Sequence, residues 1–468
     1  MNNSPYVRYT NEAERTNNNI ISIYSLAVSL VLILASVAGT LVTGEDFSEA
    51  AAGFLRILFS PARNMPDYFA LGGLSATCFN AGVCGLACSL LILINKTPAK
   101  SNVLAGFFLV IAHGFYGLNF LNMWPCFFGV VIYCKIRKLR LGDNLASAMF
   151  ATALAPFISE FLFSYPHSIT FSVLGYEVSV VGLILGLVSS ILFGFVVPAL
   201  LPGTTKMHRG FNLYKAGLAI GLFGVFIFAV MFNTMGFSPS EAVDYVNPAY
   251  ESAGRSYPVF INAVWGGLFL ATAIAGVILC KGSFKSYLAL LKKDGHQDDF
   301  CELFGMKTCL INIGTYGLFI LLYFNLAIFF TDGVGFTGNV AGLIFAAVTF
   351  SASGQHIKNV YPIILGYAGL SAVVHLICFG FGFDIPWTLS TQCYFGGIAF
   401  ATGLCPFASK YGFKYGVLAG ALSAVICSVT AQMHGGLMLY NGGFTAGLTA
   451  LLLIPILDFY NVKEKAAD

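Results

Sequence analysis

Ionisable side chains inside apolar segments are the residues of this chain most able to do chemistry. Glu160 and Lys410 hold equivalent places in two copies of one motif, so the two copies carry opposite charges. His356 and Lys358 lie at a polar break in another apolar stretch. A charge at membrane depth costs roughly 2.5–3.5 kcal/mol or more, so it usually has a partner or a role. A buried carboxylate can carry a proton, and a lysine beside a helix start can bind an anion.

Two histidines are also paired by repetition. His208 lies in Met-His-Arg-Gly and His434 in Met-His-Gly-Gly. Together with Glu160 and Lys410 they are the candidates for ion coupling. A structural interpretation remains open for all four, because Glu160 and Lys410 could reach the lipid headgroups from helix ends and the histidines could cap helices.

The motif that precedes Glu160 and Lys410 is FATALAPFIS at 150–159 and FATGLCPFAS at 400–409. Its proline removes a backbone donor, and Thr152 or Thr402 can bind the freed carbonyls. Such a break would offer polar backbone to a permeating solute, although a kink needed only for packing is the alternative. With the residues at two further polar breaks, the predicted substrate-binding set is Asn122, Thr152, His356, Lys358, Asn359 and Thr402.

These motifs belong to a longer internal repetition. Landmarks of the first half recur in the same order in the second half, at a spacing of roughly 230 residues. Asn80, Gly82 and Gly85, for example, correspond to Asn312, Gly314 and Gly317, for which close helix packing is the favoured interpretation. Duplicated halves in a membrane chain usually form a pseudosymmetric pathway with its site near the midplane.

Composition identifies the surroundings of the chain. Hydrophobic residues make up 57% and charged residues 10%, with a mean hydropathy of +0.80, which excludes a water-soluble globule. A net charge of +3 gives no support for a nucleic-acid partner. The 12 cysteines show no metal-ligand spacing, and we expect no metal and no cofactor. The amino terminus lacks the pattern of a cleaved signal peptide.

The sequence predicts an all-α integral membrane protein in which ten helices cross the bilayer. Apolar runs place them near 20–43, 68–95, 143–164, 175–200, 212–234, 258–280, 306–332, 388–407, 413–431 and 437–460. Segments 101–135 and 338–383 are interrupted by Gly and Pro, and we interpret them as re-entrant-type hairpins. Segments 46–62 and 283–296 are expected to be interfacial amphipathic helices, with a plain loop as the alternative.

Basic loops indicate the orientation. Lysines and arginines at 135–140, 281–293 and 463–465 place those segments and both termini in the cytoplasm, although Arg56 and Arg63 run against this pattern. Each half then has five crossings, and an odd number inverts the second half. We expect a cytoplasmic segment at 1–19, repeat 1 at 20–234, an external loop at 235–257, repeat 2 at 258–461 and a cytoplasmic tail at 462–468.

The chain resembles a known bacterial membrane family. The motifs NxWPxxxG from Asn122, KNxxPxxxG from Lys358, FxTxLxPxxSE, HxGxNLY from His208 and HGGLxLYNxGFxAG from His434 resemble the family catalogued as domain of unknown function 1576. The resemblance implies no activity. The architecture is more distantly similar to that of urea transporters, through a loosely matching TxPF element at 152–157 and YNGGFTAGL at 440–448. This second resemblance implies a shape and no site residues.

These observations predict a transporter or permease of a bacterial inner membrane that moves a small polar or anionic solute through a midplane site. Coupling to protons or another ion and passive, urea-transporter-like conduction both remain open. A membrane-embedded enzyme is the competing class, but the sequence contains no HExxH and no Gly-rich nucleotide loop, so we expect no enzyme. Its partners would be the bilayer and a small solute, and assembly into homo-oligomers is left open.

Overall fold

A computed structural model describes residues 11–164, 169–236, 238–241 and 256–465. The predicted external loop at 235–257 therefore lies largely outside the described residues. The first half of the chain forms these elements: α1 (Asn11–Thr43), α2 (Phe47–Leu58), α3 (Tyr68–Ile94), α4 (Ser101–His113), α5 (Met123–Arg137), α6 (Leu141–Ala151), η1 (Thr152–Leu154), α7 (Ala155–Phe163), β1 (Thr170–Val173), β2 (Tyr176–Ser179), α8 (Val180–Met207), α9 (Lys215–Phe228) and η2 (Ala229–Thr234).

The second half repeats this plan without the strands. Its elements are α11 (Ser256–Leu279), α12 (Lys285–Leu290), α13 (Phe300–Phe330), α14 (Gly338–Val348), α15 (Ile357–Phe381), α16 (Gln392–Ala401), η3 (Thr402–Leu404), α17 (Cys405–Lys410), α18 (Phe413–Met433) and α19 (Asn441–Phe459). Helix contacts recur as well: α1 packs on α3 as α11 packs on α13, α4 on α6 as α14 on α16, and α5 on α8 as α15 on α18.

Ten helices within the described residues are long and apolar enough to cross a membrane, which confirms the predicted number. One of the ten differs from the prediction. The eighth is Ile357–Phe381, inside the predicted hairpin 338–383, whereas the predicted span 388–407 is divided into the short helices α16 and α17. Pro362 lies inside α15, and the helix continues past it to Phe381.

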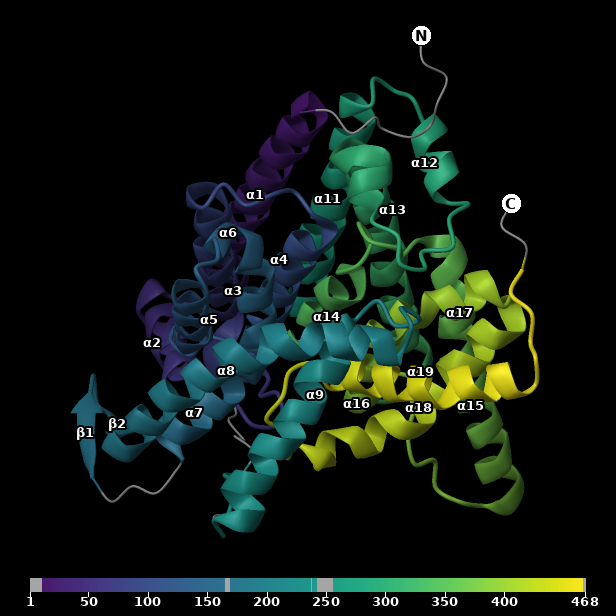
Figure 1. The fold of residues 1–468 in the computed structure, drawn as a ribbon. Helices are drawn as coiled ribbons and strands as arrows, with labels where there is room; N and C mark the ends of the chain where they lie inside the picture. Colours follow the sequence, from purple (N-terminus) through teal and green to yellow (C-terminus); the bar gives the residue numbers. More distant parts are fainter. Residues whose placement is uncertain (1–10, 165–168, 237, 242–255, 466–468) are drawn as a thin grey trace.

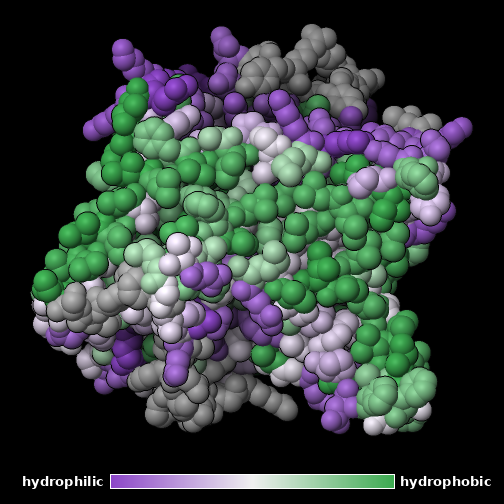
Figure 2. Space-filling model, turned by 60° about the horizontal axis from the view of Figure 1, so that its bottom comes forward, coloured by the Kyte–Doolittle hydropathy of each residue, from purple (hydrophilic) through white to green (hydrophobic). Residues whose placement is uncertain are grey.

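The molecular surface fits a bilayer. Figure 2 shows a broad hydrophobic band across the face drawn, with hydrophilic residues gathered above and below it. Glycine-rich helix faces allow the close packing underneath this band. The protein is therefore a multi-pass helical membrane protein.

A small β-hairpin is the part of the fold that the sequence analysis missed. The predicted span from 175 begins instead at Val180, because β1 and β2 pair antiparallel from Thr170 opposite Ser179 to Val173 opposite Tyr176. The turn residues Leu174 and Gly175 have φ angles of 54° and 88°, as a two-residue hairpin turn requires. Glycine adopts this conformation easily, but leucine rarely does, so the signal in the sequence was weak.

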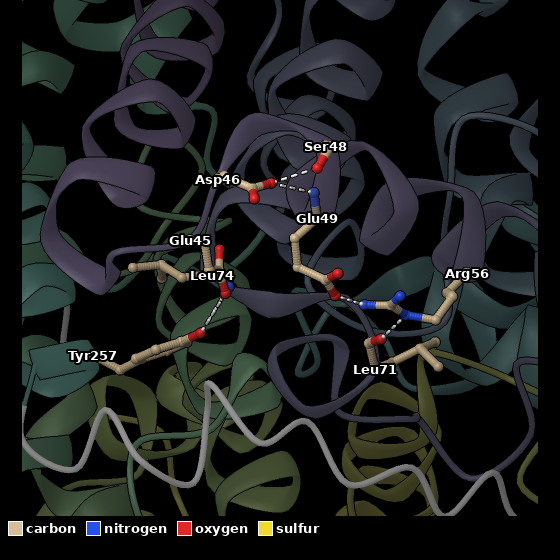
Figure 3. A network of polar contacts seen from close by, with 8 residues as sticks. All are labelled: Glu45, Asp46, Ser48, Glu49, Arg56, Leu71, Leu74 and Tyr257. Atoms are coloured by element: carbon tan, nitrogen blue, oxygen red, sulfur yellow. Dashed lines mark hydrogen bonds and ion pairs between the residues drawn. The ribbon is translucent and has the colours of Figure 1, made fainter.

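Both predicted interfacial segments contain helices, α2 and the shorter α12. Figure 3 shows how polar contacts fasten α2. Arg56 Nη2 lies 2.8 Å from Glu49 Oε1, and its Nε donates to the carbonyl of Leu71 at 3.0 Å. Asp46 caps the helix by accepting from the backbone N–H of Glu49 at 2.9 Å. Glu49 thus compensates the charge of Arg56 locally. This explains how an arginine can occur in a segment that the distribution of basic loops predicts to be external.

The two halves meet through equivalent elements: α1 contacts α11, α4 contacts α14 and α9 contacts α19. At the last of these contacts Gly217 faces its own counterpart, Gly443. A Cβ atom on Gly217 would lie 2.4 Å from the Gly443 carbonyl carbon, so a side chain cannot fit there. Contacts between equivalent elements are what a twofold relation produces. In Figure 1 α2 lies on the left of the molecule, and its counterpart α12 lies at the upper right.

Candidate functional site

The FATxLxPF motif forms the same helix break in both halves. The turns η1 and η3 interrupt the helices, and Pro156 and Pro406 lie at the start of the next ones, α7 and α17. Thr152 Oγ1 donates to the Met149 carbonyl at 2.6 Å, and Thr402 Oγ1 to the Ala399 carbonyl at 2.8 Å. The predicted breaks are confirmed, and the threonine hydroxyls stabilise them locally.

Each break is bound by the opposite half of the chain. The backbone N–H of Leu439 donates to the Ala153 carbonyl at 3.0 Å, and the N–H of Leu213 donates to the Gly403 carbonyl at 2.9 Å. Leu213 and Leu439 occupy equivalent positions just before α9 and α19. The polar backbone that the breaks expose is therefore used, at least in part, to join the two halves reciprocally.

Buried asparagines support the other pair of breaks, between α4 and α5 and between α14 and α15. Asn80 Nδ2 donates to the carbonyls of Gly114 and Leu118 at 2.8 and 2.9 Å. Asn312 Nδ2 donates to the equivalent carbonyls of Ser351 and Gln355, both at 2.7 Å. These asparagines do more than allow close packing, because each satisfies two carbonyls that a helix break leaves without helical partners.

The predicted binding residues Asn122 and Asn359 belong to the same breaks. Asn122 Oδ1 accepts from the N–H of Asn119 at 2.8 Å, and its Nδ2 donates to the Gly117 carbonyl at 3.0 Å and to Ser159 Oγ at 2.9 Å. Asn359 makes the equivalent backbone contacts, with the N–H of His356 at 3.0 Å and the Gly354 carbonyl at 2.8 Å. In this conformation both side chains hold the backbone turn.

Two aspartates form a second reciprocal connection. Asp67 Oδ1 accepts from the N–H of Phe69, which caps α3, and from the N–H of Gly338 at the start of α14, at 2.9 and 2.8 Å. Asp299 caps α13 in the same way and accepts from the N–H and Oγ of Ser101 at the start of α4, at 3.2 and 2.7 Å. Each carboxylate thus joins a long helix of its own half to the short helix of the other half, where negative charge suits the helix N-terminus.

Two cavities lie beside these connections. The first, which we name the Lys215 pocket, has a volume of about 360 Å³ and is lined by Lys100, Ser101, Asn102, Phe150, Leu201, Pro202, Thr205, Leu213, Lys215, Ala216, Gln297, Asp298, Asp299, Phe350 and Ser353. The second, the Asn441 pocket, has a volume of about 340 Å³ and is lined by Asn64, Met65, Leu343, Thr391, Gln392, Cys393, Gly396, Phe400, Ala431, His434, Gly436, Met438, Leu439, Asn441 and Gly442. Both volumes are at the low end of the range for small-molecule sites, roughly 300–1,000 Å³.

The two pockets are equivalents of one another. Six positions that line the Lys215 pocket have counterparts that line the Asn441 pocket: Phe150 and Phe400, Thr205 and Ala431, Leu213 and Leu439, Lys215 and Asn441, Ala216 and Gly442, and Gln297 and Met65. Their chemistry differs, since Lys215 and Gln297 are replaced by the neutral Asn441 and Met65. Burial raises the pKa of Asp298 in the Lys215 pocket, and the neighbouring charge of Asp294 raises it further.

Aromatic rings separate the pockets. Tyr440 contacts Phe150 of the Lys215 pocket and Phe400 of the Asn441 pocket, with ring centroids 6.5 and 6.1 Å apart. Tyr214, the counterpart of Tyr440, lies 4.5 Å from Phe350 and 4.8 Å from Phe400. We call Phe150, Tyr214, Phe350, Phe400 and Tyr440 the aromatic septum. It joins the linings of the two pockets by direct ring contacts.

Most of the predicted site residues lie outside the two linings, and His434 is the one predicted residue that lines a pocket. His434 Nε2 lies 3.0 Å from Asn441 Oδ1. His208 holds the equivalent position after α8 and is fully buried. His356 precedes α15 with its Nε2 2.9 Å from the Lys293 carbonyl, whereas Lys358 is exposed.

Glu160 and Lys410 do not pair with each other. Glu160, 1% exposed, accepts from the N–H and the hydroxyl of Ser240 at 2.8 and 2.7 Å. The carbonyl of Ser240 in turn accepts from Arg63 Nη1. Lys410 Nζ lies 3.1 Å from Asp294 Oδ2 and 3.5 Å from Glu464 Oε2. Asp294, which precedes α13, therefore compensates the charge of Lys410 directly. Arg63, which precedes α3, is connected to the carboxylate of Glu160 through Ser240.

Sequence reasoning missed Asp67, Asp299, Lys215 and the septum. A signal was present for the aspartates, because Asp67 and Asp299 have the same separation as the paired Asn80 and Asn312. Four septum residues also lie in repeated motifs, Phe150 and Phe400 in FATxLxPF and Tyr214 and Tyr440 at the end of the histidine motifs, but the repetition did not indicate that their rings meet. Within the described ranges, no group of three or more His, Cys, Asp or Glu residues is arranged to hold a metal ion.

Comparison with known proteins agrees with the duplicated architecture. The model of one family, described as "Protein of unknown function (DUF1576)", matches residues 47–233 and 279–459, one segment in each half. No curated protein and no solved structure matches the chain, and the resemblance to urea transporters stays a prediction. Because the two matched segments cover most of the chain, this protein belongs to the DUF1576 family of proteins of unknown function.

Proposed function

We propose that the protein is a membrane transporter that carries a small polar solute between the Lys215 pocket and the Asn441 pocket. The observation that carries this proposal is the equivalence of the two linings, which come from the same positions of the two halves. In transporters built from inverted repeats, one half-pathway opens to each side of the membrane, and the two exchange roles as the repeats move. Two equivalent cavities with a septum between them are what such a cycle needs.

Several features support an inverted arrangement of the halves. Equivalent elements meet one another at α1 and α11, α4 and α14, and α9 and α19. The hydrogen bonds of Leu213 and Leu439, and those of Asp67 and Asp299, are reciprocal. By the charge of the neighbouring loops, the Lys215 pocket would face the cytoplasm of a bacterial cell and the Asn441 pocket the outside.

The proposal includes a rearrangement of the reciprocal contacts. Asp67 and Asp299 bind short-helix N-termini of the opposite half, so they are positioned to change partners if the halves tilt. Proton coupling through Glu160 and passive conduction are the two finer alternatives. They differ in whether a gradient drives uphill accumulation of the solute.

Sided cysteine labelling tests the two half-pathways. Thr205 and Ala431 are half-buried counterparts that line the two pockets, and cysteine is close in size to both. The background is Cys280→Ser with Cys393→Ser, because the other ten cysteines are buried. We expect an impermeant thiol reagent to label Thr205→Cys from one side and Ala431→Cys from the other, with Ala105→Cys as a buried, unlabelled control. Labelling of both positions from the same side would contradict the proposal.

A further inference from the structure

Three polar side chains in or next to the septum have no hydrogen-bond partner among the described residues. They are His113, through both ring nitrogens, and Tyr116 and Tyr440, through their hydroxyls. Their exposed fractions are 0%, 0% and 1%. A buried polar group without a partner costs about 1–3 kcal/mol, so three together need an explanation.

These side chains form one cluster at the boundary of the two pockets. The ring of His113 lies 5.4 Å from that of Tyr116, 5.1 Å from that of Tyr440 and 6.5 Å from that of Phe400. Phe400 lines the Asn441 pocket, and Phe150, which contacts Tyr440, lines the Lys215 pocket. The cluster therefore contacts lining residues of both pockets, Phe400 on one side and Phe150 on the other.

The equivalent positions of the other half are satisfied or apolar. His113 corresponds to Phe350, and Tyr116 corresponds to Ser353. Tyr440 corresponds to Tyr214, whose hydroxyl donates to the Ala346 carbonyl. The fold thus supplies a partner for one tyrosine and none for its counterpart. Within these three pairs of positions, the unpartnered groups are those of His113, Tyr116 and Tyr440.

We propose that His113, Tyr116 and Tyr440 form the central solute-binding site and that the solute is small and uncharged, with hydroxyl or amide groups. This inference rests on the proposed function. A neutral imidazole offers one donor and one acceptor, and each tyrosine hydroxyl offers both, so the cluster can bind a group that donates and accepts at once. The contacts of His113 with aromatic rings provide no counterion, and an ion at this depth would stay uncompensated. Glu160 and Lys410 are bound to other groups.

Solute-driven swelling of proteoliposomes tests the site. The uncharged probes are glycerol, erythritol, urea and acetamide, and the permanently charged probes are sulfate and choline. We expect at least one uncharged probe to enter more than tenfold faster than into protein-free vesicles, and neither charged probe to do so. His113→Phe, a change to the residue type found at the equivalent position 350, should slow entry at least tenfold. Tyr440→Phe should slow entry severalfold.

Tyr323→Phe is the matched control, because it also removes an unpartnered buried hydroxyl, from α13 and away from both linings. It should leave the rate unchanged, and gel filtration and thermal unfolding show whether each variant is folded. Entry of an uncharged probe at an unchanged rate in folded His113→Phe would overturn the site. Entry of sulfate or choline, or of no probe at all, would overturn the substrate class. Either result leaves the proposed function standing if Thr205→Cys and Ala431→Cys still label from opposite sides.

Discussion

Individual buried polar residues in this protein mainly repair interrupted helices. Asn80, Asn312, Asn122 and Asn359 each bind backbone groups that a break leaves without helical partners. In the bilayer core no water is present to form hydrogen bonds with these backbone groups, so the side chain that binds them is needed for folding. Recurrence of an asparagine in both halves therefore indicates a recurring break and not, by itself, a ligand site.

Loss of one such asparagine should destabilise the protein. Asn312→Leu keeps the side-chain size but leaves the carbonyls of Ser351 and Gln355 without this donor. We expect the free energy of unfolding to fall by about 2 kcal/mol or more, at about 1–3 kcal/mol for each buried unsatisfied group. Denaturant titration in detergent measures this change. Asn144→Ala removes only an exposed hydrogen bond to the Arg140 carbonyl and should change it by less than about 0.5 kcal/mol, so an equal effect of the two variants would contradict this role.

Glu160 is the residue through which the proposed transport can be tested for proton coupling. Its carboxylate is buried and accepts two hydrogen bonds from Ser240. Glu160→Gln retains an acceptor but cannot release a proton. If protons drive transport through Glu160, this variant should lose uphill accumulation under an imposed pH gradient and keep downhill flux. Uptake that is insensitive to the gradient in the unmutated protein would end the coupling hypothesis.

At the scale of elements, a half-buried carboxylate, Glu45, lies at the kink near the start of α3. Gly73 interrupts α3 with a φ of 87°, and a Cβ there would lie 2.4 Å from Glu45 Oε1. Tyr257 OH, on α11 of the other half, donates to Glu45 at 3.2 Å and also accepts from the N–H of Leu74 at 3.1 Å (Figure 3). The hydrogen bonds of Tyr257 with Glu45 and with Leu74 therefore connect the segment after α1 to α3 and α11.

The protonation of Glu45 should make stability depend on pH. Burial raises the pKa of Glu45, and this exceeds the opposing effect of its hydrogen bond from Tyr257. The folded protein then binds the proton more tightly than the unfolded chain, so the free energy of unfolding should fall as pH rises from the unfolded pKa through the raised folded pKa. Glu45→Gln should be more stable than the parent above that interval and should lack this pH dependence. Thermal unfolding from pH 4 to pH 8 tests both expectations, and parallel curves for the two proteins would refute them.

At the scale of the whole molecule, the basic residues of the loops predict which side of the membrane each loop faces. Leu139 follows the basic residues that end α5, and Leu174 lies at the tip of the β-hairpin, and both side chains are exposed. In the background Cys280→Ser with Cys393→Ser, we expect Leu139→Cys to label from the cytoplasm and Leu174→Cys from outside. An impermeant reagent on intact cells and on inverted vesicles distinguishes these results. Labelling of both cysteines from one side would refute the predicted orientation.

The sequence by itself determined the membrane class, the number of spans, the duplication and the FATxLxPF breaks. These properties follow from local composition, from apolar length and from proline chemistry, all of which can be read along the chain. The eighth span is Ile357–Phe381 and not 388–407, because α15 continues past Pro362.

Only the tertiary structure decided which residues come together. The two pockets combine positions from both halves, and the cluster of His113, Tyr116 and Tyr440 joins α4 and its break to the residue before α19. Nine of the ten predicted site residues lie outside the pocket linings. Four of them, Asn122, Thr152, Asn359 and Thr402, are bound by the helix break itself. Which buried polar groups stay unpaired depends on every neighbour in three dimensions, and no spacing along the sequence encodes that.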